Sequence, residues 1–543
     1  MNRYAAITLF GILGFACLSA SLAVAQVKDP QRPDGPSASE AQPPAQFQPS
    51  PPSEAVPFDP QRPDDKSPRK AGKHDPNQPQ IIQLTLTPAA EPVPALKYSL
   101  LPSPTERTPG NGATNYYRAI LHAQQIQSAA PKEDRDSFNQ HLQKWYDTHL
   151  KDLSPDDKRE MEKWVGYYRK ALAETKLAAY REECHFNLRL QDLRGMDTIN
   201  YLLHDFQESR SLARALRLRA RLEVANGKLD EALETVREGL QLGRDTAEPE
   251  LLINGLIGIA IASMMQEELI EIIDQPGSPN LYWALASLPR PLVDMRRGMQ
   301  FELDLPERMF PFLKDAETAQ RTPEEWQKLM VESFDHITEA AGTQSRAPEW
   351  QSRLVATAAL AMVYSDAKKR LLDEGFDRES LEKLPVAQVV AIQASRAQKR
   401  VYQNVFKWSS LPYFQQGTHA EDSFKSMMAE WGGPGQMTAA DPLLLARLLL
   451  PGVQQAMSAE IRTQLNFAAL QTIEALRMHA AANGGKLPNS LQDVTIVPVP
   501  VNPATNQPFV YELKDGVATL TAQPIDGLPA ALGKIYVIRM EAK

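Results

Sequence analysis

The chain has 543 residues, of which 59 are Lys or Arg and 67 are Asp or Glu, so its formal net charge at pH 7 is −8. This acidic balance argues against nucleic acid as a partner and gives the chain no basic face for binding a membrane surface. Only two cysteines are present, Cys17 and Cys184, so the fold has to rely on the size of its core, for which this length is ample.

The first 25 residues have the pattern of a secretory signal peptide. Arg3 supplies the positive start, residues 5–25 carry no charge, and small residues precede the cleavage position after Ala25. Such a signal predicts export to the periplasm or cell envelope, and its removal leaves Cys184 as a single thiol, which we expect to be buried. Two alternatives stay open. Residues 5–25 are long enough to remain as an inner-membrane anchor if they are not cleaved, and Cys17 is a candidate lipidation site.

Residues 26–80 predict a disordered, extended tether rich in proline. The stretch 26–109 holds 20 of the 43 prolines, and residues 26–80 contain almost no large apolar side chain besides Phe47 and Phe58. Such a composition cannot bury enough surface to offset the entropy lost on ordering. A tether of this kind would let the folded part stand off a membrane or wall.

The pattern of a folded protein begins near residue 81, and residues 81–435 predict a helical body. At its start, Ile82, Leu84 and Leu86 alternate with polar residues, as they would in a short strand that ends before Pro88. Helical spacing then dominates from residue 112 onward.

Three helices of this body have particularly clear signals. A capping residue followed by proline and two acidic residues occurs at Ser154–Asp157 and again at Thr322–Glu325, so each should begin a helix. Residues 251–273 are nearly all apolar, but acidic residues interrupt or flank this run. We therefore expect a buried helix there and not a membrane span.

Residues 212–243 predict a helical hairpin. Small residues stand at Ala220, Ala232 and Gly239, where two antiparallel helices would approach closely, and Gly227 should close the first helix. This spacing resembles one unit of the tetratricopeptide family, and the resemblance implies a solenoid that binds protein partners. An ordinary amphipathic hairpin is the alternative.

The most distinctive segment is PNLYWALASLPRP at residues 279–291. Its aromatic residues, with the arginines in and after it, form a candidate surface for a protein partner, because Trp, Tyr and Arg are enriched at binding hot spots. The candidate residues are Tyr282, Trp283, Arg290, Arg296 and Arg297. The alternative is a rigid corner between helices, in which Trp283 fills the core and the prolines set the turn.

Residues 94–111, the hairpin and residues 279–302 together resemble a group of exported planctomycete proteins of unknown function. The resemblance covers most of the chain. It implies export and the division into signal peptide, tether and folded part, but it brings no activity with it.

Motifs that carry chemistry do not occur in this sequence. There is no nucleophile elbow, phosphate loop, dinucleotide fingerprint or metalloprotease helix, and the nine histidines lack ligand spacing. We therefore expect no cofactor and no metal site. Glu302, Asp304 and Glu307 could bring two carboxylates together for acid–base work, although ion pairs with arginines such as Arg296 and Arg308 are the simpler expectation.

Residues 455–543 predict a small α+β module. A helix is expected at 460–482, followed by strands at 509–513, 517–521 and 535–540, the first two joined by a glycine turn. One helix would then cover a three-stranded antiparallel sheet. The predicted fold class is mainly α, with a solenoid-like helical-repeat body and this C-terminal module.

Two segments of the module, GGKLPNSLQDV at 484–494 and NPATNQPFVYEL at 502–513, resemble the C-terminal half of type II secretion pseudopilins. In that family a long helix leads to a turn and then to a proline-flanked strand. The resemblance implies a similar shape for the module. Pseudopilins polymerise through a hydrophobic helix at their mature N-terminus, whereas the helix in this chain is internal, so filament formation is not implied.

These observations predict an exported, non-catalytic helical scaffold that binds a protein partner in the bacterial envelope. One alternative is an enzyme of the hydrolase or lyase type built on stacked helices. Another is an accessory component of an envelope secretion machine. A shallow apolar and aromatic groove would favour the scaffold, whereas a deep pocket with converging carboxylates, histidine and arginine would favour the enzyme.

Overall fold

The computed structural model describes residues 79–189, 192, 207–249, 251–340, 349–416, 419–430, 444–522 and 533–541. The predicted signal peptide and the predicted tether up to residue 78 lie outside the described residues. So does the stretch 5–25 that would form a membrane anchor. Within the described part, no helix has both the length and the apolar character needed to cross a bilayer.

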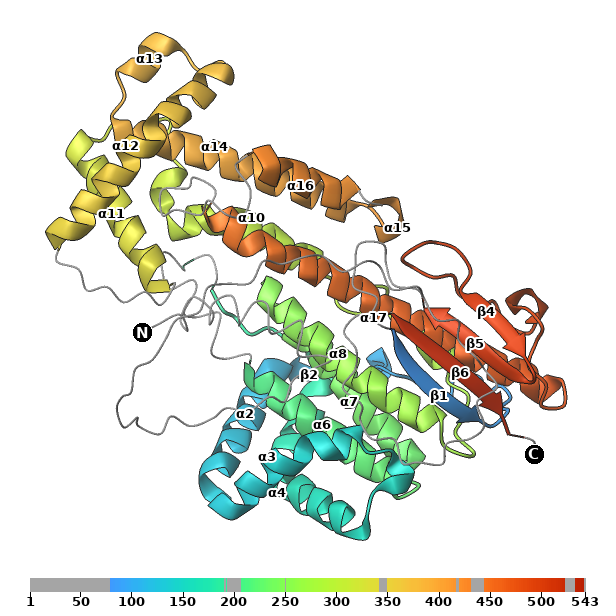
Figure 1. Cartoon of the computed structure of the whole chain (residues 1–543). Helices are drawn as coiled ribbons and strands as arrows, with labels where there is room; N and C mark the ends of the chain where they lie inside the picture. The colour runs from blue at the N-terminus through green and yellow to red at the C-terminus, as the bar shows by residue number, and fades with distance from the viewer. Residues whose placement is uncertain are drawn as a thin grey trace, which may run out of the picture.

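The protein is mainly helical, with a small sheet at one end (Figure 1). The helices are α2 (Gly112–Ala129), α3 (Lys132–Asp147), α4 (Pro155–Ala179), α6 (Gln207–Ala225), α7 (Leu229–Thr246), α8 (Leu252–Ile273), α9 (Tyr282–Ala286), α10 (Arg296–Met309), α11 (Pro323–Ala340), α12 (Glu349–Asp373), α13 (Arg378–Glu382), α14 (Val386–Phe406), α15 (Tyr413–Gln416), α16 (His419–Glu430) and α17 (Leu444–Ala482). The main sheet holds β1 (Gln80–Leu86), β4 (Val510–Lys514), β5 (Val517–Ala522) and β6 (Lys534–Met540), and a separate parallel pair joins β2 (Thr108–Asn111) to β3 (Arg181–Glu183).

The predicted helix starts are confirmed by their capping contacts. The Ser154 hydroxyl accepts a hydrogen bond from the backbone N–H of Asp157 at 3.0 Å, with Pro155 at the first helical position. Before α11, Thr322 and Glu325 each bond the other's backbone N–H, at 3.2 and 2.8 Å. Both pairs satisfy donors that the first turn of a helix leaves free.

The predicted helical hairpin is present as α6 and α7, and Gly227 separates them with a left-handed φ of +74°. The close approach occurs elsewhere than expected, however. A Cβ on Gly239 would lie 2.2 Å from the Met265 sulfur of α8, and one on Gly258 of α8 would lie 2.4 Å from the Gly243 carbonyl oxygen of α7. The small residues therefore bring α7 against α8, so the unit that packs is three helices.

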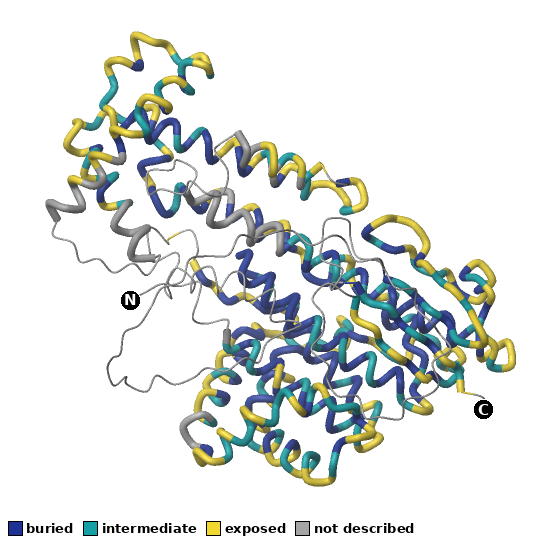
Figure 2. The backbone as a smooth tube through the Cα atoms, viewed as in Figure 1, coloured by how far each residue is buried: buried dark blue, intermediate teal, exposed yellow. Residues whose placement is uncertain are grey.

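Helix α8 lies at the centre of the molecule and is buried on almost every side (Figure 2). It packs on α6 and α7 on one side and on α10 and α17 on the other. An all-apolar helix is stable in water only when neighbours cover all its faces. This confirms the buried helix predicted from residues 251–273.

The C-terminal module has four strands, in the order β1-β6-β5-β4, where three were expected. The predicted strands after residue 509 are present within a residue or two, and the strand predicted at 82–86 is β1, which pairs in parallel with β6 from Gln80–Lys534 to Leu86–Met540. Alternation makes this pairing favourable, because Leu84 and Leu86 face the core at 3% and 0% exposure. The start of the helical body thus contributes an edge strand to the C-terminal sheet.

The sheet and the helical body share one hydrophobic core, which includes Leu86 of β1, Leu476 of α17 and Ile261 of α8. Helix α17 begins at Leu444, earlier than the 460 expected, and its C-terminal half runs along the sheet (Figure 1). Its earlier part contributes Ala456 and Ala459 to a second cluster with α10 and α14. This long helix therefore connects the module to the body.

Candidate functional site

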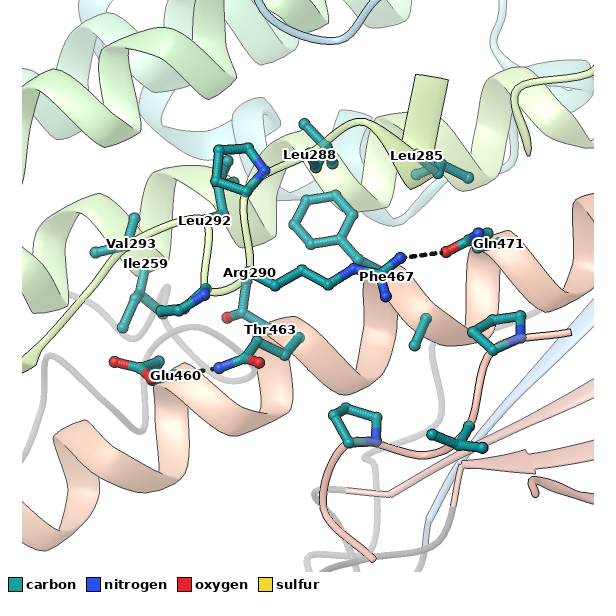
Figure 3. Close-up of a pocket in the computed structure, with 17 residues that line it drawn as sticks. Ile259, Leu285, Leu288, Arg290, Leu292, Val293, Glu460, Thr463, Phe467 and Gln471 are labelled. Atoms are coloured by element: carbon teal, nitrogen blue, oxygen red, sulfur yellow. Dashed lines mark hydrogen bonds between the residues drawn. The ribbon is translucent and has the colours of Figure 1, made fainter. Parts of the chain in front are cut away.

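A pocket of about 150 Å³ opens where the body meets the C-terminal module (Figure 3). Its walls come from the end of α9 and the residues that follow it up to 293, from Ile259 of α8, from one face of α17, and from the loop 500–503. These four segments are far apart in the sequence. The pocket exists only because the fold brings them together.

The lining from α17 follows the spacing of one helical face. Glu460, Gln464, Phe467 and Gln471 line the pocket, and residues three, four or seven positions apart lie above one another on a helix. With a rise of 1.5 Å per residue, the stretch from Glu460 to Gln471 is about 16 Å long. The pocket therefore has two ends, marked by these two polar residues.

Opposite α17, the wall is the corner that follows α9. Pro289 and Pro291 flank Arg290 there, and proline lacks the N–H that a continuing helix would need. The peptide bond between Arg290 and Pro291 is cis. Leu285, Leu288 and Leu292 join the prolines in this wall, so most of the surface that meets the pocket is apolar.

A buried ion pair fixes the start of this corner against α17. The side chains of Glu474 and Arg477 are both 0% exposed and lie 2.9 Å apart. The Arg477 guanidinium also donates to the carbonyl oxygens of Thr87 at 3.0 Å and Ser278 at 2.8 Å, while Glu474 accepts the backbone N–H of Leu281 at 3.1 Å. One arginine thus connects the segment after β1, the segment before α9 and the long helix.

Two charged groups mark the opposite ends of the pocket. At one end, Nη2 of Arg290 donates to Oε1 of Gln471 at 2.8 Å. At the other, the Glu460 carboxylate accepts the Met295 backbone N–H at 2.8 Å and the Gln464 side chain at 3.3 Å. Burial raises the pKa of Glu460 to about 7. The pocket is therefore apolar along its length, with a cation at one end and an acid that titrates near neutral pH at the other.

Two of the five residues predicted as a partner surface, Tyr282 and Trp283, lie in α9 and do not line the pocket. Tyr282 is 3% exposed, and its hydroxyl donates to the Pro498 carbonyl oxygen at 2.5 Å. Trp283 packs edge-on against Tyr282, with ring centroids 5.0 Å apart, and its indole N–H donates to Glu91. Both aromatic side chains have partners within the fold, although only Tyr282 is buried and Trp283 is half-buried.

Of the three arginines in that set, Arg290 lies in the corner and the other two are adjacent on α10. Arg290 lines the pocket, whereas Arg296 is exposed at the start of α10 and pairs with Asp294 at 2.6 Å. Arg297 is exposed on the next position of the same helix. Of the five predicted residues, the structure brings only Arg290 into the pocket.

The remaining candidates for chemistry are possible metal ligands, the thiol of Cys184 and the carboxylates of α10. In the described part of the chain, no group of His, Cys, Asp and Glu side chains is arranged to hold a metal ion. Cys184 is buried, as expected, and burial raises the pKa of its thiol. A thiol held protonated in this way is a poor nucleophile.

Glu302 does not form the ion pair with an arginine that was expected from the sequence. It is 8% exposed on α10, and none of the described residues forms an ion pair with it, while Glu307 on the same helix pairs with Lys399 at 2.7 Å. Burial raises the pKa of Glu302 to about 7, and the Tyr402 ring system lies close enough for the two groups to interact electrostatically. The carboxyl is thus held in a mainly apolar cluster between α10 and α14.

Replacing Glu302 with glutamine will change how stability depends on pH. The folded-state pKa of about 7 is above the ordinary 4.5, so the folded protein binds this proton more tightly than the unfolded chain does. The resulting stabilisation is complete below about pH 4.5 and is lost as the pH rises to 7, a fall of about 3 kcal/mol at 1.36 kcal/mol per pH unit. Urea unfolding at pH 5 and pH 8 will show that Glu302→Gln removes this fall. Asp304→Asn, at an exposed position of the same helix, controls for the loss of a charge, and an equal pH response in wild type and Glu302→Gln would contradict the assignment.

The pocket residues outside the segment 279–291 were not predicted from the sequence. Phe467 and Gln471 lie in a helix that was expected, at positions that follow its amphipathic spacing. That spacing marks a face that packs against something, but an inward face covered by protein and a face lining a pocket look alike.

No protein-family model matches this chain, and no curated protein or solved structure matches it. The resemblances to tetratricopeptide units, to pseudopilins and to exported planctomycete proteins therefore remain predictions.

Proposed function

We propose that this protein is an exported, non-catalytic scaffold of the bacterial envelope that binds a protein partner through the pocket between the corner and α17. The observation that carries the proposal is the pocket itself, an apolar hollow at the junction of the body and the module. In the described lining, a single carboxylate and a single arginine stand at opposite ends, and they do not converge on one point as acid–base chemistry would need.

The size of the pocket supports the binding of one side chain. A cavity of about 150 Å³ lined by aliphatic and aromatic residues is large enough for a benzene-sized group. A side chain that fills such a pocket and loses its contact with water is a typical anchor of a protein interface. The walls are held in place without a ligand, by the prolines and by the buried pair of Glu474 and Arg477. The site is thus preorganised, which lowers the entropic cost of binding.

The proposal is tested by photo-cross-linking in intact cells. A photoreactive phenylalanine analogue replaces Val501, which lines the pocket and is 45% exposed, and in a matched control it replaces Val510 of β4, which is 42% exposed outside the pocket. We expect one discrete protein adduct from position 501 and none of that mass from position 510.

A second variant connects the adduct to the pocket. Ala468→Trp fills the hollow from the α17 side, and it should abolish the adduct from position 501 while the melting temperature stays close to that of the parent. An adduct that survives in the filled variant, or that forms equally from both positions, would rule out binding in the pocket. If the photoreactive residue at position 501 forms no adduct with any other protein, the enzyme alternative would be favoured.

A further inference from the structure

Arg290 is held at the mouth of the pocket in a way that leaves most of its donors open. It is exposed, its guanidinium is positioned by Gln471, and prolines on both sides restrict its backbone. Among the described residues, no carboxylate lies within ion-pair distance of it. Because a guanidinium presents five N–H donors in a planar fork, an arginine placed in this way is suited to bind a carboxylate with two parallel hydrogen bonds.

Apolar residues of the pocket lining lie beside the Arg290 guanidinium. Figure 3 shows the Arg290 side chain extending past the ring of Phe467 toward Gln471. Glu460, the acid in the lining, lies about 16 Å along the axis of α17 from Gln471, the residue that Arg290 contacts. A ligand that fits this end of the pocket therefore carries an apolar group and a carboxylate close together.

The geometry of an extended peptide decides where that carboxylate comes from. Successive side chains of a strand point to opposite faces, so when an apolar side chain enters the pocket an acidic neighbour points away from Arg290. The terminal carboxylate of a chain, in contrast, is attached to the same Cα as the last side chain. Capture of a C-terminal carboxylate is one of the recurring ways in which proteins recognise peptides.

We infer that the pocket binds the C-terminal residue of its partner, with an apolar side chain on Phe467 and the terminal carboxylate on Arg290. This inference rests on the proposed function, because it specifies which part of the partner enters the pocket. It also gives the exposed Arg290 a role that a purely structural corner does not require.

The test measures the binding of fluorescein-labelled pentapeptides to the full chain by fluorescence anisotropy. The first probe is Ala-Ala-Ala-Ala-Phe with a free carboxylate, the second is the same peptide with a C-terminal amide, and the third is Ala-Ala-Ala-Asp-Phe amide. A charge-assisted bidentate contact is strong enough that the free carboxylate should bind at least about tenfold more tightly than either amide. Arg290→Gln should reduce its affinity to that of the amide, and Arg539→Gln, which removes an exposed arginine of β6, should leave it unchanged.

The outcomes separate this inference from the proposed function. Equal binding of the free carboxylate and the amide would overturn the inference, as would tightest binding of the aspartate peptide, which would place the acid inside the partner chain. Absence of peptide binding, together with a specific adduct at position 501, would overturn the inference and leave the proposed function in place. If neither peptide binding nor the adduct at position 501 is observed, the inference and the proposed function are both overturned.

Discussion

Replacing Arg477 with leucine will lower the free energy of unfolding by about 3 to 5 kcal/mol, the cost of leaving a buried charge without its partner. Both Arg477 and Glu474 are fully buried, and burial raises the pKa of Glu474 even with the arginine present. The leucine also leaves the carbonyl oxygens of Thr87 and Ser278 without this donor. Equilibrium unfolding in urea, followed by circular dichroism, will measure the loss.

The matched control removes both charges. In the double variant Arg477→Leu with Glu474→Leu no unpaired charge remains, so it should be more stable than Arg477→Leu alone. The carbonyl groups stay unpaired in both variants, whereas the double variant also leaves the Leu281 backbone N–H without its acceptor. The difference between them is therefore the cost of the unpaired carboxylate less the cost of this lost hydrogen bond. If the double variant is no more stable than the single one, the unpaired carboxylate costs no more than that hydrogen bond.

Replacing Gly258 with leucine will destabilise the protein by about 3 kcal/mol, because the new side chain has no room between α7 and α8. Its Cβ would lie 2.4 Å from the Gly243 carbonyl oxygen and 2.9 Å from the Ala247 Cβ. The first of these is a backbone atom, which cannot move away unless the two helices separate. The melting temperature will show the loss directly.

The control for this substitution is Gly166, which lies in α4 and has no atom within 4 Å of the position where a Cβ would be. Gly166→Leu should raise the free energy of unfolding by up to about 1 kcal/mol, because leucine has the higher helix propensity. The two substitutions are chemically identical and should have opposite signs. An equal melting temperature for Gly258→Leu and wild type would mean that α7 and α8 do not approach each other this closely.

Features that depend only on residues close together in the sequence could be predicted from it. The capping residues Ser154 and Thr322, the left-handed Gly227, and the apolar run that became α8 are local signals, and each has one physical interpretation. The mainly helical fold with a small α+β module follows from them. Strand alternation at Ile82, Leu84 and Leu86 also predicted β1 itself.

The pairing of β1 could not be predicted in the same way. Alternation shows that a strand has one buried face, but it says nothing about which strand lies beside it. The partner of β1 is β6, near the other end of the chain, so local reasoning assigned β1 to the helical body and counted three strands in the module. The contact of Gly239 with α8, where α6 was expected, has the same cause.

The candidate site was predicted only in part, for a related reason. The segment 279–291 stood out by composition, and composition does not tell an aromatic residue that fills the core from one that meets a partner. Tyr282 and Trp283 contact other parts of the fold from α9, while Arg290 lines the pocket. The opposite wall comes from α17 and the loop 500–503, so no pattern within one segment could show it.

The parallel pairing of β1 with β6 has a consequence for the order in which the protein is made. A ribosome releases β1 before all the described helices of the body and β6 after them. The edge of β1 that receives β6 therefore stays open while those helices are made, and an unpaired strand edge is prone to associate with other chains. If the chain is exported as its N-terminus predicts, this late closure is useful, because the sheet cannot complete before the last strand has been made and a chain still incompletely folded can pass through a translocation channel.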